Sequence, residues 1–179
     1  MKTLVIIGHP DIESSVVNRK WIEEMKMYPD LFTIRELAKE YPEGVIDIET
    51  EQSLITSHGN LVLQFPVYWF NCPPILKKWL DEVFTEGWAF GKLGNNLKDR
   101  KIALGVTAGS KSVDYDKKGR YKYNLEEVLA SFEITAKYCK ADYQSFFAFY
   151  GADFSPTQDI DKSAKQYVDF LKKLIWTYK

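Results

Sequence analysis

The chain has 179 residues, a formal net charge of −1 and two cysteines, Cys72 and Cys139, that lie far apart in the sequence. This charge argues against nucleic-acid binding through bulk positive charge, and two distant cysteines suggest neither a metal site nor a disulfide framework. No apolar run approaches the length of a membrane span, and no signal peptide is visible. We therefore expect a single domain over residues 1–179, located in the reducing cytoplasm.

Strand-like and helix-like segments alternate along the chain. Most of the strand-like runs are continuously apolar, which is typical of strands buried on both faces of a parallel sheet. The five predicted strands are Thr3–Ile7, Leu31–Ile34, Leu61–Phe65, Ile102–Val106 and Ser145–Phe149. The five predicted helices are Val16–Met27, Asp47–Ser57, Ile75–Phe84, Leu125–Tyr138 and Ile160–Tyr178. This alternation predicts an α/β fold with a doubly wound sheet, whose ligands bind beyond the carboxyl ends of the strands.

The segment after the first predicted strand, GHPDIESSVVN (8–18), leads into a helix. It lacks both the G-x-G-x-x-G pattern of dinucleotide-binding folds and the P-loop pattern. The exposed N–H groups of a first helical turn nevertheless favour a phosphate. Further donors in this segment are His9, Ser14, Ser15 and Asn18. A capped helix, with His9 hydrogen-bonded in a turn, explains the same residues without a ligand.

The segment after the third predicted strand is QFPVYWFNCPPILKKWLDE (64–82), with three consecutive aromatic residues, Tyr68-Trp69-Phe70, between prolines. A stiff backbone that carries aromatic rings at the mouth of a sheet suits a flat, conjugated ligand. The alternative is that the rings pack beneath the loop or against a partner subunit. Cys72, in the same turn, is either a packing residue or a redox thiol, and packing explains it more simply.

The segment after the fourth predicted strand is VTAGS (106–110). Gly109 permits a close backbone approach, and successive N–H groups can form an anion-binding nest. Thr107 and Ser110 add hydroxyl groups, although an ordinary glycine-containing turn would look the same. Taken together, the three loops predict a phosphate cradle, an aromatic platform and an N–H nest at one edge of the sheet.

The longer segment QFPVYWFNCPPILKKWLDEVFTEGWAFG (64–91) closely resembles the central motif of the flavodoxin-like NAD(P)H quinone oxidoreductases. This family includes DT-diaphorase, small bacterial quinone reductases and the ancillary subunits of glutathione-gated potassium efflux systems. The resemblance covers nearly the whole chain. It implies a three-layer sandwich around a five-stranded parallel sheet in the order 2-1-3-4-5. It also implies a homodimer with its active sites at the subunit interface.

The resemblance further implies the positions of the site residues. The flavin phosphate is expected at His9, Ser15, Val17 and Asn18. The isoalloxazine ring is expected over a turn made of Pro66, Val67, Tyr68, Trp69 and Phe70, mostly through backbone contacts. Its pyrimidine edge is expected at Thr107, Ala108, Gly109 and Ser110. The residues that close the pocket from the partner subunit, and contact the substrate, are Trp88, Ala89 and Phe90.

Two tyrosines are the catalytic candidates. Tyr115 falls at the position of the family's active-site tyrosine, which also contacts the flavin. Tyr121 stands where DT-diaphorase has a histidine partner, so a relay that needs this imidazole is in doubt. The surrounding segment 114–123 also carries Lys117, Lys118, Arg120 and Lys122, which either meet the extra phosphate of NADPH or are solvated. His58 belongs to no motif and is expected at the surface.

The implied activity is two-electron, ping-pong hydride transfer from NADH or NADPH through FMN to a quinone-like acceptor. FMN is favoured over FAD because the chain ends soon after its fifth helix. The alternative is a regulatory subunit of a potassium efflux system, with a membrane transporter as its partner. A one-electron flavodoxin fits poorly, because the segment GHPDIESS (8–15) does not match a flavodoxin phosphate loop and such proteins are usually far more acidic.

Overall fold

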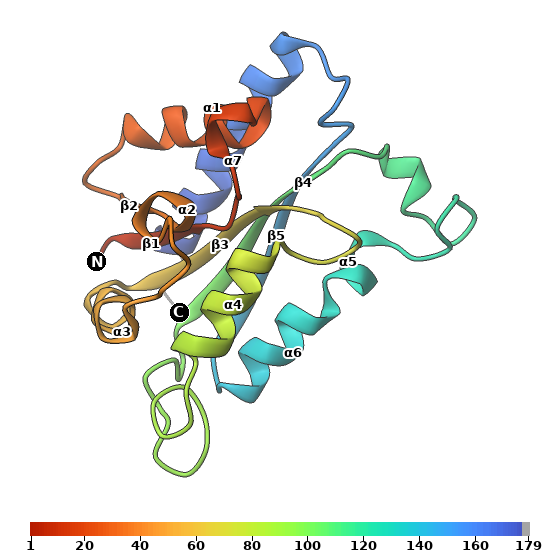
Figure 1. Ribbon diagram of the computed structural model, residues 1–179. Coiled ribbons are helices and arrows are strands. Elements are labelled where there is room, and N and C mark those ends of the chain that lie inside the picture. The colour runs from red at the N-terminus through yellow and green to blue at the C-terminus, as the bar shows by residue number, and fades with distance from the viewer. Residues whose placement is uncertain (177–179) are drawn as a thin grey trace.

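A computed structural model describes residues 1–176 and contains one five-stranded parallel sheet in the order β2-β1-β3-β4-β5 (Figure 1). The strands are β1 (Thr3–Ile7), β2 (Phe32–Glu36), β3 (Asn60–Pro66), β4 (Lys101–Ala108) and β5 (Asp142–Tyr150). The predicted fold class and strand order are therefore confirmed. The central strands β1 and β3 are buried along their whole length, whereas β2 and β5, at the edges, are only partly buried.

Helices cover both faces of the sheet (Figure 1). One face carries α1 (Val16–Lys26) and α7 (Thr157–Trp176), which pack against each other. The other carries α3 (Ile48–Ser57), α4 (Pro74–Val83) and α6 (Ala130–Tyr138). The shorter elements are α2 (Leu37–Glu40), α5 (Leu125–Val128) and two 3₁₀ turns, η1 (Ile12–Ser14) and η2 (Ser112–Asp114).

One predicted helix is divided in the structure, and one short α-helix was not predicted. The predicted helix 125–138 is interrupted at Leu129, whose backbone (φ −91°, ψ 3°) leaves the α-helical region while its side chain stays buried. Two short helices, α5 and α6, result. The short helix α2 was not predicted, because four residues are too few to show a helical period. The last two residues of the predicted helix 160–178 lie outside the described residues.

Alternating side chains of the buried strands build two separate cores. Leu4 and Ile6 of β1 point to the face of α3 and α4, whereas Val5 and Ile7 point to the face of α1 and α7. In the second core, the Trp21 ring stacks on Tyr167 at 4.2 Å between ring centroids, and Trp21 Nε1 donates to Ser163 Oγ at 3.0 Å. This packing joins α1 to α7 and so fixes the position of the α1 N-terminus.

A buried carboxylate joins three further elements. Glu51 of α3 is fully buried, and its two oxygens accept hydrogen bonds from Arg35 Nε (2.8 Å), Tyr41 Oη (2.7 Å) and Trp79 Nε1 (2.9 Å). These bonds offset the cost of removing the charge from water. Because Trp79 lies on α4, the network holds the helix that follows the aromatic turn.

His58 is buried, and its predicted surface position is wrong. Its Nδ1 atom donates to the carbonyl of Leu54 at 2.7 Å, and its Nε2 atom lies 2.7 Å from Thr33 Oγ1. Its role is therefore to connect α3 with β2. Among the helices within residues 1–176, none has both the length and the apolar character needed to cross a bilayer.

Candidate active site

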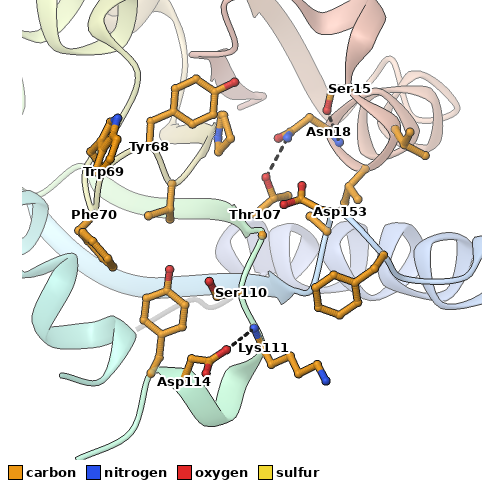
Figure 2. A pocket seen from close by; sticks show the side chains of 18 of the residues that line it. Ser15, Asn18, Tyr68, Trp69, Phe70, Thr107, Ser110, Lys111, Asp114 and Asp153 are labelled. Atoms are coloured by element: carbon orange, nitrogen blue, oxygen red, sulfur yellow. Dashed lines mark hydrogen bonds between the residues drawn. The ribbon is translucent and has the colours of Figure 1, made fainter. Parts of the chain in front are cut away.

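A cavity of about 1150 Å³ opens at the carboxyl end of the sheet (Figure 2). Its walls come from the segments that follow β1, β3, β4 and β5. Strands β1 and β3 are neighbours in the sheet, with β2 on the outer side of β1. The cavity therefore lies at the switch in strand order, where open α/β sheets bind their ligands.

The N-terminus of α1 forms one end of the cavity. Ser15 is the N-cap residue, and its Oγ accepts the N–H of Asn18 at 3.2 Å. Ser14, Val16 and Val17 also line the cavity, so the first turn of an eleven-residue helix faces it. The partial positive charge of a helix N-terminus and its free N–H groups make this end suitable for a phosphate.

His9 also lines the cavity and is buried, with its ring centre 6.5 Å from that of Tyr68. Its Nδ1 atom accepts the N–H of Asp11 at 3.1 Å, which leaves the proton of the neutral ring on Nε2. Burial lowers the pKa of His9, and the neighbouring Asp11 opposes this shift only partly. His9 is therefore a neutral donor at pH 7, as expected for a side chain that bonds a ligand without adding charge.

A buried amide network connects α1 with two strands. Gln64 Nε2 donates to the backbone carbonyl (3.2 Å) and Oδ1 (3.3 Å) of Asn18, and Asn18 Nδ2 donates to Thr107 Oγ1 at 2.9 Å. Since Thr107 Oγ1 accepts this bond, the Thr107 hydroxyl is free to donate its own proton into the cavity. Gln64 was not among the predicted site residues. Its signal is a lone amide inside the apolar run of β3.

The three aromatic residues form a strained hairpin turn. Tyr68 and Asn71 exchange two backbone hydrogen bonds of 2.8 and 2.9 Å across Trp69 and Phe70, whose φ angles are +49° and +61°. Two-residue hairpin turns with positive φ at both positions usually contain asparagine and glycine, because larger residues are strained there. The turn presents Trp69 almost wholly to solvent, with 94% of its surface exposed, at the edge of the cavity (Figure 2).

The four N–H groups of this turn differ in whether the chain itself already uses them. The N–H of Val67 donates to the carbonyl of Thr107 at 2.8 Å, and the N–H of Tyr68 is used within the hairpin. Within residues 1–176 no acceptor bonds the N–H groups of Trp69 and Phe70. A ligand over the turn can therefore take backbone hydrogen bonds from these last two residues, whereas Val67 and Tyr68 offer their side chains.

The loop after β4 supplies a second pair of N–H groups. Gly109 packs so closely on Asp153 that a Cβ atom there would lie 2.4 Å from Asp153 Oδ2. No group in the described part of the chain accepts the N–H of Gly109 or Ser110. Both residues line the cavity, as does Thr107, so this wall can stabilise an anionic or carbonyl oxygen. Ala108 is buried behind them and does not line the cavity.

The two candidate tyrosines lie together beside this loop. Tyr121 Oη and Ser110 Oγ are 2.7 Å apart, and the Tyr121 ring contacts the rings of Phe70 (4.9 Å) and Tyr115 (5.1 Å). Tyr115 is buried against Tyr150, and burial, followed by its neighbours Tyr121, Tyr150 and Asp114, raises its pKa. Tyr115 therefore stays protonated at neutral pH. No residue in the described range 1–176 hydrogen-bonds its hydroxyl, which leaves the hydroxyl open to a ligand.

The predicted substrate residues lie outside this cavity. Trp88, Ala89 and Phe90 belong to the loop between α4 and β4, and none of them lines the cavity. Ala89 is fully buried in its own chain, Trp88 packs against Phe84, and Phe90 packs against Tyr138. The cavity of one chain does not use them, so their predicted role depends on a second copy.

Cys72 is buried below the aromatic turn, and burial raises the pKa of its thiol to about 11. It is therefore a protonated, poorly nucleophilic thiol at neutral pH, which favours the packing interpretation. Within residues 1–176 no group of three or more histidine, cysteine, aspartate and glutamate side chains is arranged to hold a metal ion.

The fold and this cavity define a class of protein, and comparisons with known proteins agree. A family model described as a flavodoxin-like fold matches residues 1–173. The chain belongs to the flavodoxin-like NAD(P)H quinone oxidoreductase family.

Three relatives show how similar this chain is to known proteins. General stress protein 14 of Treponema denticola, solved in complex with FMN, is 48% identical over 97% of this chain and 99% of its own, with a TM-score of 0.93. The uncharacterized NAD(P)H oxidoreductase YrkL of Bacillus subtilis is 40% identical over 96% of this chain and 98% of its own. KefG of Enterobacter sp., an ancillary protein of a glutathione-regulated potassium-efflux system, is 32% identical over 98% of this chain and 96% of its own.

Proposed function

We propose that this protein is a flavin-dependent NAD(P)H oxidoreductase that binds FMN in the cavity and reduces a quinone-like acceptor by two electrons. The observation that carries the proposal is the layout of the cavity. A helix N-terminus with neutral donors lies at one end, and a strained aromatic turn with two free N–H groups lies at the other. A flavin mononucleotide has the same layout, with a phosphate at one end and a flat, polar-edged ring at the other.

The residues present fit FMN at both ends. Ser15, His9 and the first turn of α1 would hold the phosphate without a cationic side chain. The free N–H groups of Trp69 and Phe70, and those of Gly109 and Ser110, would meet the polar edges of the ring. The relative from Treponema denticola, whose solved structure contains FMN, supports this choice over FAD. A bound flavin would take a hydride from the nicotinamide and pass two electrons to the acceptor.

The chain's own contribution to the reaction is orientation and protonation. The N–H groups of Gly109 and Ser110 would stabilise negative charge at the ring edge during reduction. The paired hydroxyls of Ser110 and Tyr121, and the open hydroxyl of Tyr115, would donate hydrogen bonds or a proton to the acceptor oxygen. Tyr121 lies where DT-diaphorase has a histidine, and here its hydroxyl bonds to a serine. A serine–tyrosine pair would then take over the function of the missing imidazole.

Reconstitution with flavins tests this proposal. The apoprotein is titrated with FMN, FAD and riboflavin in turn, and binding is followed by flavin fluorescence. We expect saturable binding of one FMN per chain, with weaker binding of riboflavin because it lacks the phosphate. Absence of saturable binding for all three flavins would reject the flavin site, whereas a preference for FAD would reject only the choice of FMN.

We also propose a cytoplasmic homodimer in which the Trp88–Phe90 loop of one chain closes the cavity of the other. Hydrogen bonds hold this loop in place, because the N–H of Asn96 donates to the Trp88 carbonyl at 3.1 Å and the N–H of Gly87 donates to the Phe90 carbonyl at 2.9 Å. Leu93, Ile134 and Tyr138 leave an exposed apolar surface beside it, which a second copy would cover. Sedimentation should give twice the chain mass of 20.8 kDa. A fully active monomer would reject the shared site.

The second candidate function is that of an ancillary subunit of a potassium efflux system. The similarity to KefG along nearly the whole chain favours it. In this case the flavin site would serve regulation, and a membrane transporter would be the partner. Potassium efflux measured in a strain that lacks the gene should then fall, and a cavity variant that no longer binds FMN should not restore it. Unchanged efflux in the deletion strain would reject this second function and leave the oxidoreductase function as the remaining candidate.

A further inference from the structure

The loop between β4 and α5 carries several cations, and the structure separates those that face the cavity from those that do not. Lys117 forms an ion pair with Glu127 and lies over the ring of Tyr123. Lys118 lies at a second, smaller hollow beside Ser112. Arg120 and Lys111 instead line the active-site cavity. Of the cations described here, Arg120 and Lys111 are therefore the ones placed to contact a molecule bound in the cavity.

Arg120 and Lys111 are held weakly. The Arg120 guanidinium carbon lies 5.6 Å from the centre of the Tyr121 ring, and Lys111 Nζ lies 5.7 Å from the centre of the Phe154 ring. Neither side chain forms an ion pair with any residue from 1 to 176. Contacts of exposed cations with aromatic faces are weak. Both charges can therefore turn toward an anion at small cost.

Two carboxylates also line the cavity but form no ion pair with these cations. Asp114 Oδ2 accepts the backbone N–H of Lys111 at 3.0 Å, and Asp153 packs against Gly109. Neither carboxylate forms an ion pair with Arg120 or Lys111. His9, which also lines the cavity, has a pKa lowered by burial and stays neutral beside Asp11. The four side chains sum to no net charge, so what a ligand can use is the pair of cationic groups, which form no ion pair with either carboxylate.

The two cations are far from the end that suits the cofactor phosphate. Ser15 and Lys111 lie on opposite sides of the cavity in Figure 2. Strand β4, which leads to both cations, is separated from β1, which leads to α1, by β3. A quinone-like acceptor carries no charge that needs these side chains. The remaining ligand of the proposed reaction, the dinucleotide donor, carries at least two phosphate charges.

We propose that Arg120 and Lys111 bind the phosphate groups of the dinucleotide donor, an inference that rests on the proposed function. The guanidinium of Arg120 can bond two phosphate oxygens at once, whereas Lys111 acts as a point charge. The same chemistry serves the pyrophosphate, which NADH and NADPH share, and the 2′-phosphate, which only NADPH has. Recognition of the 2′-phosphate would make NADPH the preferred donor.

Equilibrium binding of oxidised nucleotides tests this without turnover. FMN-loaded protein is titrated with NAD⁺ and with NADP⁺ by calorimetry, at low and at moderate salt. The variants are Arg120→Gln and Lys111→Gln, with Lys118→Gln as the control from the same loop. The affinities of the variants for FMN and riboflavin are measured as well, because they report on the resident phosphate.

We expect Arg120→Gln to raise the Kd of NADP⁺ about three- to tenfold, with a smaller rise for Lys111→Gln and none for Lys118→Gln. The effect should shrink as salt increases. A rise for NADP⁺ alone assigns the 2′-phosphate, and an equal rise for NAD⁺ assigns the pyrophosphate. Unchanged Kd values for both nucleotides would overturn the inference, as would a loss confined to FMN affinity. If wild-type protein binds no flavin, the proposed function fails first, and this inference fails with it.

Discussion

The backbone at Trp69 carries strain that a single substitution can relieve. Its φ of +49° lies in the left-handed region, which costs an L-residue about 1–2 kcal/mol and which asparagine enters more readily. Because 94% of the Trp69 surface is exposed, its replacement removes little packing. We therefore expect Trp69→Asn to raise the free energy of unfolding of the apoprotein by about 1 kcal/mol. For a chain of this size, that gain raises Tm by about 2–4 °C.

The matched control is Trp69→Ala, which removes the same ring but lacks the short polar side chain that lets asparagine adopt a positive φ, so the strain remains. Urea unfolding followed by far-UV circular dichroism measures both variants, since this signal depends little on the lost tryptophan. The alanine variant should remain near wild type. If the asparagine and alanine variants are equally stable, the turn is not strained and the reasoning is wrong. Both variants should bind FMN about fivefold more weakly, because both lose the same ring.

Three further predictions concern single side chains. Tyr115→Phe should slow the acceptor half-reaction about fivefold, measured by stopped-flow absorbance, because it removes one hydrogen bond worth about 1 kcal/mol. The affinity for FMN should be retained. A collapse of FMN affinity would instead show that the role of Tyr115 is structural. Trp79→Phe should lower the free energy of unfolding by about 1–3 kcal/mol, because it removes one of three donors to the buried Glu51 carboxylate, and a neutral result would contradict that network. The folded-state pKa of His9 lies below its ordinary 6.5, so the unfolded chain binds more protons and stability should fall as pH drops below about 6.5. His9→Gln should make the dependence of Tm on pH flatter in this range, and an unchanged slope would assign the dependence to other groups.

The sheet could be predicted because most of its strands are continuous apolar runs, which are visible in the sequence. The edge of the sheet that carries the cavity could be predicted from the topology, since ligands of such sheets bind beyond the carboxyl ends of the strands. The sequence also indicated the proline-bounded aromatic turn, and Pro74 does occupy the first turn of α4. These features are local, or follow from a general rule of the fold, and so are visible without coordinates.

Other features depend on tertiary contacts that no local pattern records. The positive φ angles of Trp69 and Phe70 contradict the usual preferences of aromatic residues. The N–H of Val67 is used by Thr107, a residue forty positions away, so its loss as a ligand donor could not be foreseen. The surface position expected for His58 had no other basis than the lack of a motif around it, whereas its contacts with Leu54 and Thr33 bury it. Gln64 had a signal, a polar side chain within an apolar strand.

The most direct test of the central claim is an anaerobic titration of the FMN-reconstituted protein. The absorbance of the oxidised flavin is recorded while NADPH or NADH is added, followed by a quinone. We predict that about one equivalent of nucleotide bleaches the flavin and that about one equivalent of quinone restores its absorbance, as two-electron transfer through one site requires. Flavin that stays oxidised with both nucleotides, or that the quinone does not reoxidise, would contradict the proposed function.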